Sequence, residues 1–156
     1  MATLNSYSAV VAEINNRVEK AVKMTASEMQ EKLKECIQEK YYDEYDPTSY
    51  IPRTYKFLNS AVAKMLGKSS ASIGIDEAYF DYEYPKRYTS KSSGITKSDN
   101  VHWTGEDQTM MGSQGYHGNA FIRTEGRFWD EFIAWADKNA VPLLKKNLII
   151  CGVNVK

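Results

Sequence analysis

The sequence predicts an α+β fold, and three observations lead to that prediction. Apolar residues before residue 40 recur at steps of three and four, the spacing of one helix face. Around residues 72–84 apolar and polar residues alternate, as they do along a half-buried strand. The C-terminal part returns to helical spacing. At 156 residues the chain is predicted to form a single domain, residues 1–156, which needs no disulfide or metal for stability.

The first predicted helix runs from about residue 7 to residue 40. Its apolar stripe contains no proline or glycine and comprises Tyr7, Val11, Ile14, Val18, Val22, Met29, Leu33, Ile37 and Tyr41. Asn5 or Ser6 can cap the first turn by accepting from its exposed amide groups. A continuous helix here would span roughly 50 Å, which is longer than a domain of this size needs. We therefore expect either a break near residues 25–27 or a projecting segment over residues 1–25.

A tyrosine-rich segment with two prolines, Pro47 and Pro52, follows the first helix. Because proline fixes φ and disfavours helix at the residue before it, the helix must end there. Residues 53–66 are then predicted to form a second helix, with one apolar side made of Tyr55, Leu58, Val62, Met65 and Leu66. Gly67 would end this helix in the left-handed conformation.

Two strands are predicted next, at residues 72–76 and 80–84, and we expect them to pair as a hairpin of a small antiparallel sheet. Residues 85–118 show little periodicity and are predicted to be a long flexible loop that is functional or disordered, with a short helix at about residues 105–111. Residues 120–123 fit a brief strand.

The last substantial helix is predicted to begin after Gly126. The apolar residues at roughly helical spacing are Phe128, Phe132, Trp135, Val141, Leu144 and Leu148. Pro142 lies inside this pattern, and so we expect a kink or a break near residues 139–141. Residues 151–155 are predicted to form a turn and a last edge strand.

The charge balance argues against several partners. Acidic and basic residues number 20 each, and the pI is near 6.7. A nucleic-acid-binding protein normally carries a clustered basic surface, because phosphate neutralisation supplies most of its affinity. We therefore expect no specific nucleic acid as a partner. No window approaches 18 apolar residues and no secretion signal is recognisable, so neither a membrane nor export is expected.

The residues that could carry chemistry are few. Cys36 and Cys151 are predicted to be reduced thiols in or near the core, with a disulfide as the alternative. His102 and His117 lack the spacing and companion ligands of a zinc site. The glycines of residues 112–118 lack the order of a phosphate-binding loop. No catalytic residue, cofactor or metal is predicted, and the chain is expected not to be an enzyme. The alternative is a small hydrolase or nuclease that uses His102 or His117.

Aromatic residues are the remaining notable feature, with 11 tyrosines and 3 tryptophans. These side chains supply contact area at low entropy cost and are favoured at interfaces. Several of these aromatic residues lie in stretches of little periodicity. Six are candidate interface residues: Tyr79, Tyr82, Tyr84, Tyr88, Trp103 and Tyr116. The alternative for each is that it lines the core of the sheet.

The order of several segments resembles a known class of proteins. After the charged amphipathic helix come Tyr42-Asp43-Glu44-Tyr45-Asp46-Pro47, Arg53-Thr54-Tyr55-Lys56-Phe57-Leu58-Asn59-Ser60, Gly115-Tyr116-His117-Gly118 and Gly126-Arg127-Phe128-Trp129-Asp130-Glu131-Phe132. From about Glu28 onward, this series resembles small structural proteins from the head–tail joining region of phages and prophages of Gram-positive bacteria, the neck or tail-completion class. The first residues, to about Lys23, lie outside the resemblance.

The resemblance implies a virion protein, assembled in the host cytoplasm, that forms a multimeric ring joining the portal-connector complex of the head to the tail tube. Its partners would be copies of itself, the head connector, and tail-tube or tail-terminator proteins. It implies no site residues. A tail terminator is the alternative within the same class, and a host-directed binding module is a further alternative.

Overall fold

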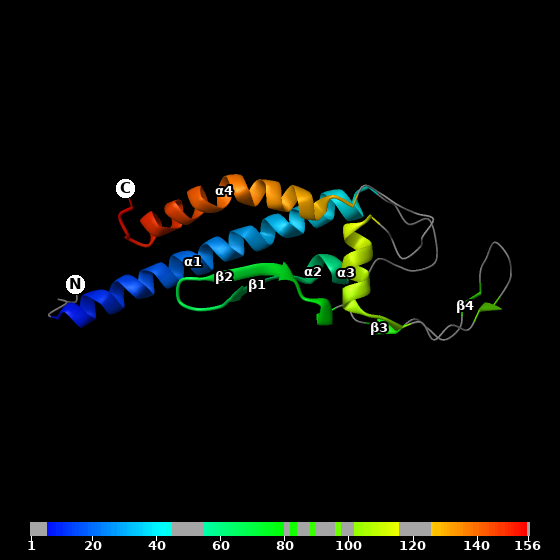
Figure 1. Cartoon of the computed structure of the whole chain (residues 1–156), viewed down its shortest axis with the longest axis horizontal. Coiled ribbons are helices and arrows are strands. Elements are labelled where there is room, and N and C mark those ends of the chain that lie inside the picture. Colours follow the sequence, from blue (N-terminus) through cyan, green and yellow to red (C-terminus); the bar gives the residue numbers. More distant parts are fainter. Residues whose placement is uncertain are drawn as a thin grey trace.

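The protein has the predicted α+β architecture, with two long helices and antiparallel strand pairs (Figure 1). A computed structural model describes residues 6–44, 55–79, 82–83, 88–89, 96–97, 102–115 and 126–155. In chain order the elements are α1 (Tyr7–Ile37), the π-helical turn η1 (Gln38–Tyr42), α2 (Lys56–Asn59), β1 (Ala61–Met65), β2 (Ala71–Ile75), the 3-10 turn η2 (Glu77–Tyr79), β3 (Tyr82–Glu83), β4 (Tyr88–Thr89), β5 (Thr96–Lys97), β6 (His102–Trp103), α3 (Gly105–Ser113) and α4 (Phe128–Ile150).

Helix α1 is continuous, so the break considered near residues 25–27 does not occur. The Thr25 hydroxyl donates to the Ala21 carbonyl at 2.9 Å, which keeps this residue within the helix. Ser6 caps the first turn as predicted, because its Oγ accepts from the Ala9 amide at 3.2 Å. Ala21 is the first buried residue of the helix, whereas Tyr7 is 85% exposed. The start of α1 therefore projects from the core, which was the other predicted outcome.

Helix α4 packs antiparallel along α1, and the end of α4 lies beside the projecting part of α1 (Figure 1). It runs without interruption through Pro142, so the helix does not break near residues 139–141, and a kink there stays a prediction. Pro142 lies on the exposed side of the helix. There the Lys138 carbonyl, which proline leaves without its helical donor, can be hydrated instead, and packing against α1 holds the helix on both sides of the proline.

The predicted second helix is wrong over most of its length. Only Lys56–Asn59 is helical, and Ala61–Met65 forms strand β1, which pairs with β2 in the register Ala61↔Ile75 to Met65↔Ala71. Gly67 lies in the hairpin turn rather than at a helix end, and its φ is not positive. The hairpin packs on α1, where Gln30 Nε2 donates to the Ala61 carbonyl at 2.7 Å. Strand pairing and packing thus override a helical spacing of apolar residues.

The strand predicted at residues 72–76 is confirmed as β2, but its predicted partner is wrong. Its partner is β1, while Tyr82 and Glu83 of β3 pair with Trp103 and His102 of β6. Helix α3 confirms the short helix expected inside the 85–118 region. The strand considered at residues 120–123 lies outside the described residues, and residues 151–155 form a turn and a coil without a strand.

The core lies where α1, η1, α2, β1 and α4 meet. Its buried residues are Leu33, Cys36, Ile37, Tyr42, Phe57, Ala61, Phe128 and Phe132. Cys36 is buried and Cys151 half-buried, both as free thiols, in agreement with the prediction. Burial raises the pKa of the Cys36 thiol, which keeps it protonated and unreactive near neutral pH.

A polar network fixes the register of α4 on α1. Asn147 is fully buried, and its Nδ2 donates to Thr25 Oγ1 at 3.0 Å and to Glu28 Oε1 at 2.9 Å. Lys146 Nζ donates to the other oxygen of Glu28 at 2.9 Å. Asn147 Oδ1 has no partner, which leaves one unsatisfied acceptor in the interface. A shift of α4 by one turn would bury the Asn147 amide without partners, and so this network selects a single helix alignment.

Replacing Glu28 with glutamine is expected to destabilise the protein more at pH 7 than at pH 3. Hydrogen bonds from Asn147, and then from Lys146, lower the pKa of the Glu28 carboxyl in the folded state. Its stabilising contribution is therefore complete above the ordinary pKa of about 4.3 and is lost as the pH falls through the lower folded value. Urea unfolding of both proteins across this range measures the difference.

The control is the same substitution in an Asn147→Ala background, where the main cause of the low pKa is absent. There the Glu28→Gln effect should depend on pH much less. An effect of equal pH dependence in both backgrounds would show that Asn147 does not stabilise the Glu28 carboxylate.

Candidate interaction surfaces

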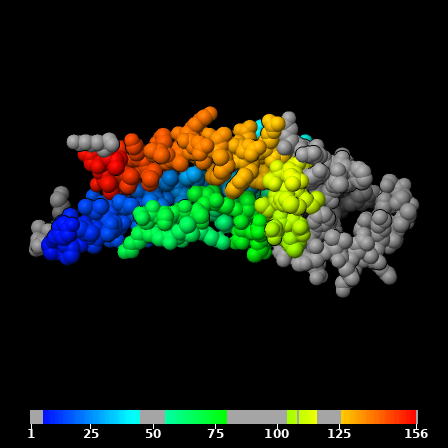
Figure 2. All heavy atoms as spheres, in the orientation of Figure 1, coloured from blue at the N-terminus to red at the C-terminus, as the bar shows by residue number. Residues whose placement is uncertain are grey.

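Among the described residues, large exposed apolar side chains occur at the end of the β1–β2 hairpin, where Met65 and Leu66 lie, and in three further places. Figure 2 shows the elongated shape of the molecule. The tip patch, on the projecting start of α1, consists of Tyr7, Val10 and Ile14. The α3-end group, near η2 and α3, consists of Tyr55, Tyr79 and Met110. The α4 face consists of Trp129, Ile133, Val141, Ile149 and Ile150. The first two lie toward opposite ends of the described part of the chain, and the third runs along its side (Figure 1).

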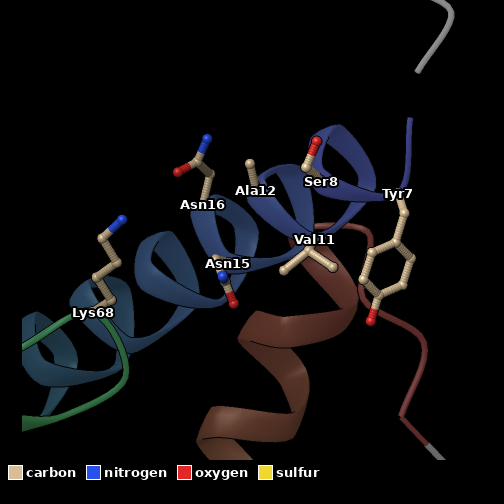
Figure 3. A pocket seen from close by; sticks show the side chains of 7 residues that line it. All are labelled: Tyr7, Ser8, Val11, Ala12, Asn15, Asn16 and Lys68. Carbon is tan, nitrogen blue, oxygen red and sulfur yellow. The ribbon is translucent and has the colours of Figure 1, made fainter. Parts of the chain in front are cut away.

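The tip patch is exposed because α1 begins at Tyr7, whereas the first residue of this helix that is buried is Ala21. Arg17 holds this region to the end of α4, since its Nη1 donates to the Gly152 carbonyl at 3.2 Å and its Nε donates to Glu13 Oε1 at 2.8 Å. Beside the tip patch, a hollow of about 410 Å³ is lined by Tyr7, Ser8, Val11, Ala12, Asn15, Asn16 and Lys68 (Figure 3). Its lining has no carboxylate, histidine or thiol.

An aromatic cluster joins η1, α2 and the start of α4 at the other end of the molecule. The Phe57 ring lies 5.1 Å from Tyr41 and 5.4 Å from Phe128, both in edge-to-face contact. The Trp129 ring lies 5.7 Å from that of Phe132. Such pairs add stability beyond the area that they bury. Because Trp129 is 36% exposed, it connects this core cluster to the α4 face.

Glycines let α3 pack closely against this end. A Cβ on Gly105 would lie 1.8 Å from the Glu77 carbonyl oxygen, and a Cβ on Gly112 would lie 3.2 Å from the Phe57 ring. Gly126, with φ of +62°, brings the chain back against the backbone of Gly115. The glycines of this region therefore permit close packing, whereas the sequence indicated only flexibility. Thr104 caps α3 by accepting from the Asp107 amide at 3.1 Å.

The structure brings two of the six predicted interface residues together. Tyr82 and Trp103 are register partners on β3 and β6. Tyr88 is on β4 opposite Lys97, away from that pair in the strand pairing, and Tyr79 ends η2 with 54% of its surface exposed. Tyr84 and Tyr116 lie outside the described residues. The interface role of all six stays a prediction.

Sequence reasoning missed the α4 face. It counted Val141 with the core, but this side chain is 63% exposed. Trp129, Ile133 and Ile149 each follow a residue of the predicted apolar stripe, so periodicity alone assigns them no role. A surplus of large apolar residues, more than one helix stripe can bury, was the available signal.

The alternative of catalysis by histidine gains no support from the described geometry. His102 is placed through its backbone on β6, and His117 lies outside the described residues. Among the residues that the structure describes, no three His, Cys, Asp or Glu side chains gather as metal ligands. None of the helices in that part of the chain combines the length and apolar character needed to cross a membrane.

A family model named YomN matches residues 5–148, which is nearly the whole chain. The chain belongs to the YomN family. The match includes residues 5–23, which lie outside the resemblance noted in the sequence. Membership of the YomN family is consistent with a phage or prophage origin. Comparisons with curated proteins and with solved structures found no match.

Proposed function

We propose that this YomN-family protein is a structural subunit of the phage virion. In this proposal it acts at the head–tail joint, as a neck or tail-completion protein, and assembles as a multimeric ring between the connector and the tail. The observation that best supports the proposal is that large apolar residues are exposed toward both ends of the described part of the chain, in the tip patch and in the α3-end group (Figure 1). The phage or prophage origin favours the same class of function.

The two end groups suit the requirements of a ring. Neighbouring subunits of a ring meet through heterologous contacts, in which one surface binds a different surface of the next copy. The tip patch is formed by one tyrosine and two aliphatic side chains, while the α3-end group offers two tyrosines and a methionine. Apolar residues exposed in groups, rather than singly, are typical of interaction sites.

Joining a head to a tail requires contact surfaces rather than catalysis. The exposed apolar groups of the described residues are candidates for such surfaces. The Asn147 network aligns α4 on α1, whose start carries the tip patch. At the other end Phe57 packs on Phe128 of α4 and against Gly112 of α3, which connects the α3-end group to the helix pair. Fixed separation and direction are what closure of a ring demands, because each interface must repeat the same rotation. The proposed partners are accordingly other copies of this chain, the head connector, and the tail-tube or tail-terminator proteins.

Loss of the protein from a phage that encodes it is expected to yield DNA-filled heads and separate tails instead of joined particles. Electron microscopy of lysates, with the gene supplied in trans as the control, measures the fraction of joined particles. The reason is that, in this proposal, the ring is the part that connects the head to the tail. Normally joined particles in the absence of the protein would contradict the proposal.

Fractionation of the separated heads and tails distinguishes the neck assignment from the tail-terminator alternative. A neck subunit that binds the connector first should sediment with the heads. A terminator should sediment with the tails. Substitution of both His102 and His117 by alanine should leave joining intact if contact is the function, whereas a required catalytic histidine would abolish it.

A further inference from the structure

We propose that two copies of this chain pair through the α4 face, as antiparallel helices about a two-fold axis at Val141. This inference goes beyond the proposed function and does not depend on it, because it rests on α4 alone. A two-fold pair is closed, and so it leaves the tip patch and the α3-end group available for other contacts.

The exposed side of α4 forms two ridges with a period of four residues. The first row is Trp129, Ile133, Asp137, Val141, Lys145 and Ile149, and the second is Asp130, Ala134, Lys138, Pro142, Lys146 and Ile150. Every member of both rows is exposed, whereas α1 covers the opposite side. Rows of this spacing are the ridges that interdigitate when two helices pack. The α4 face therefore has the form of an unfilled helix-packing surface.

The apolar content of the first row is high for a solvent-facing surface. Ile133, Val141 and Ile149 are 45%, 63% and 60% exposed. Successive members of this row turn by about 40° around the helix, so a partner helix that crosses at Val141 would cover Val141 with its row neighbours Asp137 and Lys145, and would leave Ile133 and Ile149 at the edges of the contact. Burial of such side chains favours association, because it removes their apolar surface from water.

The charges on this face are self-complementary. The acidic residues Asp130 and Asp137 precede the basic residues Lys138 and Lys145 along the helix. Within the part of the chain that the structure describes, these four side chains form no ion pair, whereas Lys146 pairs with Glu28 and Glu131 with Lys40. Antiparallel pairing centred on Val141 sets Asp137 of each copy against Lys145 of the other. Parallel pairing would set like charges together and is disfavoured.

The same charge pattern favours a second copy over other occupants. A nucleic acid or an anionic membrane surface would be attracted by charge of one sign, but these four residues sum to zero. The helix of 23 residues is roughly 34 Å long, which limits the interface to the small end of the range for specific complexes. We therefore expect a dimer with a dissociation constant on the order of micromolar.

Sedimentation of the purified full chain at concentrations from about 1 to 100 micromolar tests the pairing. The unmodified protein should move from monomer to dimer over this range. Val141→Asp, which would place two carboxylates together at the axis, should raise the dissociation constant by at least about tenfold. The control Ser27→Asp, at an exposed position of α1, should leave it unchanged. A monomer throughout, or equal effects of both substitutions, would overturn the proposal.

Charge reversal tests the antiparallel register independently of Val141. Asp137→Lys and Lys145→Asp should each weaken the dimer, and the double variant should restore it, because each copy then carries both reversed partners. The control is Lys23→Asp, on the exposed side of α1. Failure of the double variant to restore the dimer would rule out this register.

Cross-linking locates the axis. In a Cys151→Ser background, Val141→Cys should form a disulfide-linked dimer under mild oxidation, since a residue on the axis meets its own copy within the distance that a disulfide needs. Ser27→Cys in the same background should stay monomeric. No excess of cross-linked dimer for Val141→Cys over Ser27→Cys would place the contact elsewhere and contradict the proposal.

Discussion

Replacing Phe128 with alanine is expected to lower the free energy of unfolding by about 3–5 kcal/mol. Phe128 is 1% exposed, at the first turn of α4, and it packs against core residues of α1, η1 and α2. Its ring lies 5.4 Å from Phe57 and 6.2 Å from Trp129. These large neighbouring rings cannot collapse fully into the space that the substitution leaves, so a cavity adds to the lost burial. Urea unfolding measures the loss.

The matched control is Trp129→Ala, at the next position of the same helix. Trp129 is larger but 36% exposed, so its removal should cost less, about 1–2 kcal/mol. The slope of unfolding free energy against urea should stay unchanged in both variants, which would show that stability alone has changed. If Trp129→Ala destabilised the protein more than Phe128→Ala, Trp129 rather than Phe128 would be the main core residue at the start of α4, which would contradict the structure.

The long helices could be predicted because the helical spacing of their apolar residues is visible within each segment of the sequence. Leu33 and Ile37 in α1, and Phe128 and Phe132 in α4, recur at helical spacing and are all buried. Ser6 could be recognised as a cap since a capping side chain acts within one turn. The continuity of α4 through Pro142 could not be predicted this way, because packing against α1, a helix distant in sequence, offsets the missing hydrogen bond.

The hairpin shows the limit of local patterns. Val62 and Met65 are three residues apart, which fits a helix, yet both belong to β1. Their conformation depends on cross-strand partners, Gly74 and Ala71, and on the surface of α1 beneath them. The pairing of β3 with β6 depends even more on distant sequence, and two-residue strands are too short to show alternation.

The sequence indicated which types of residue a contact surface would contain, but not where on the protein they would lie. Abundant tyrosine and tryptophan indicated a protein that makes contacts, and Tyr79 is indeed exposed. The exposure of Val141 and Ile133 could not be deduced, because α4 carries large apolar residues on more than one side and their spacing alone does not say which of them the core takes up. That choice follows from the alignment of α4 on α1, which depends on buried Asn147, a residue type that sequence patterns assign to surfaces.

Replacing Gly126 with alanine is expected to lower the free energy of unfolding by about 2 kcal/mol or more. The φ of Gly126 is +62°, a left-handed conformation that disfavours a side chain. The added Cβ would also lie 2.1 Å from the Gly115 amide nitrogen, a contact that backbone must move to relieve. Because Gly115 follows the end of α3, relief of this contact should loosen α3 from the aromatic cluster, whose Phe57 packs on Gly112.

Hydrogen exchange locates this effect, and Gly74→Ala provides the control. Gly74 lies in β2 with nothing within 4 Å of an added Cβ, so its substitution should change stability by no more than about 0.5 kcal/mol. In Gly126→Ala, amides of α3 should exchange faster while those in the middle of α1 keep their protection relative to global stability. Equal exchange of α3 in both variants would show that the close approach of residues 115 and 126 does not hold α3 in place.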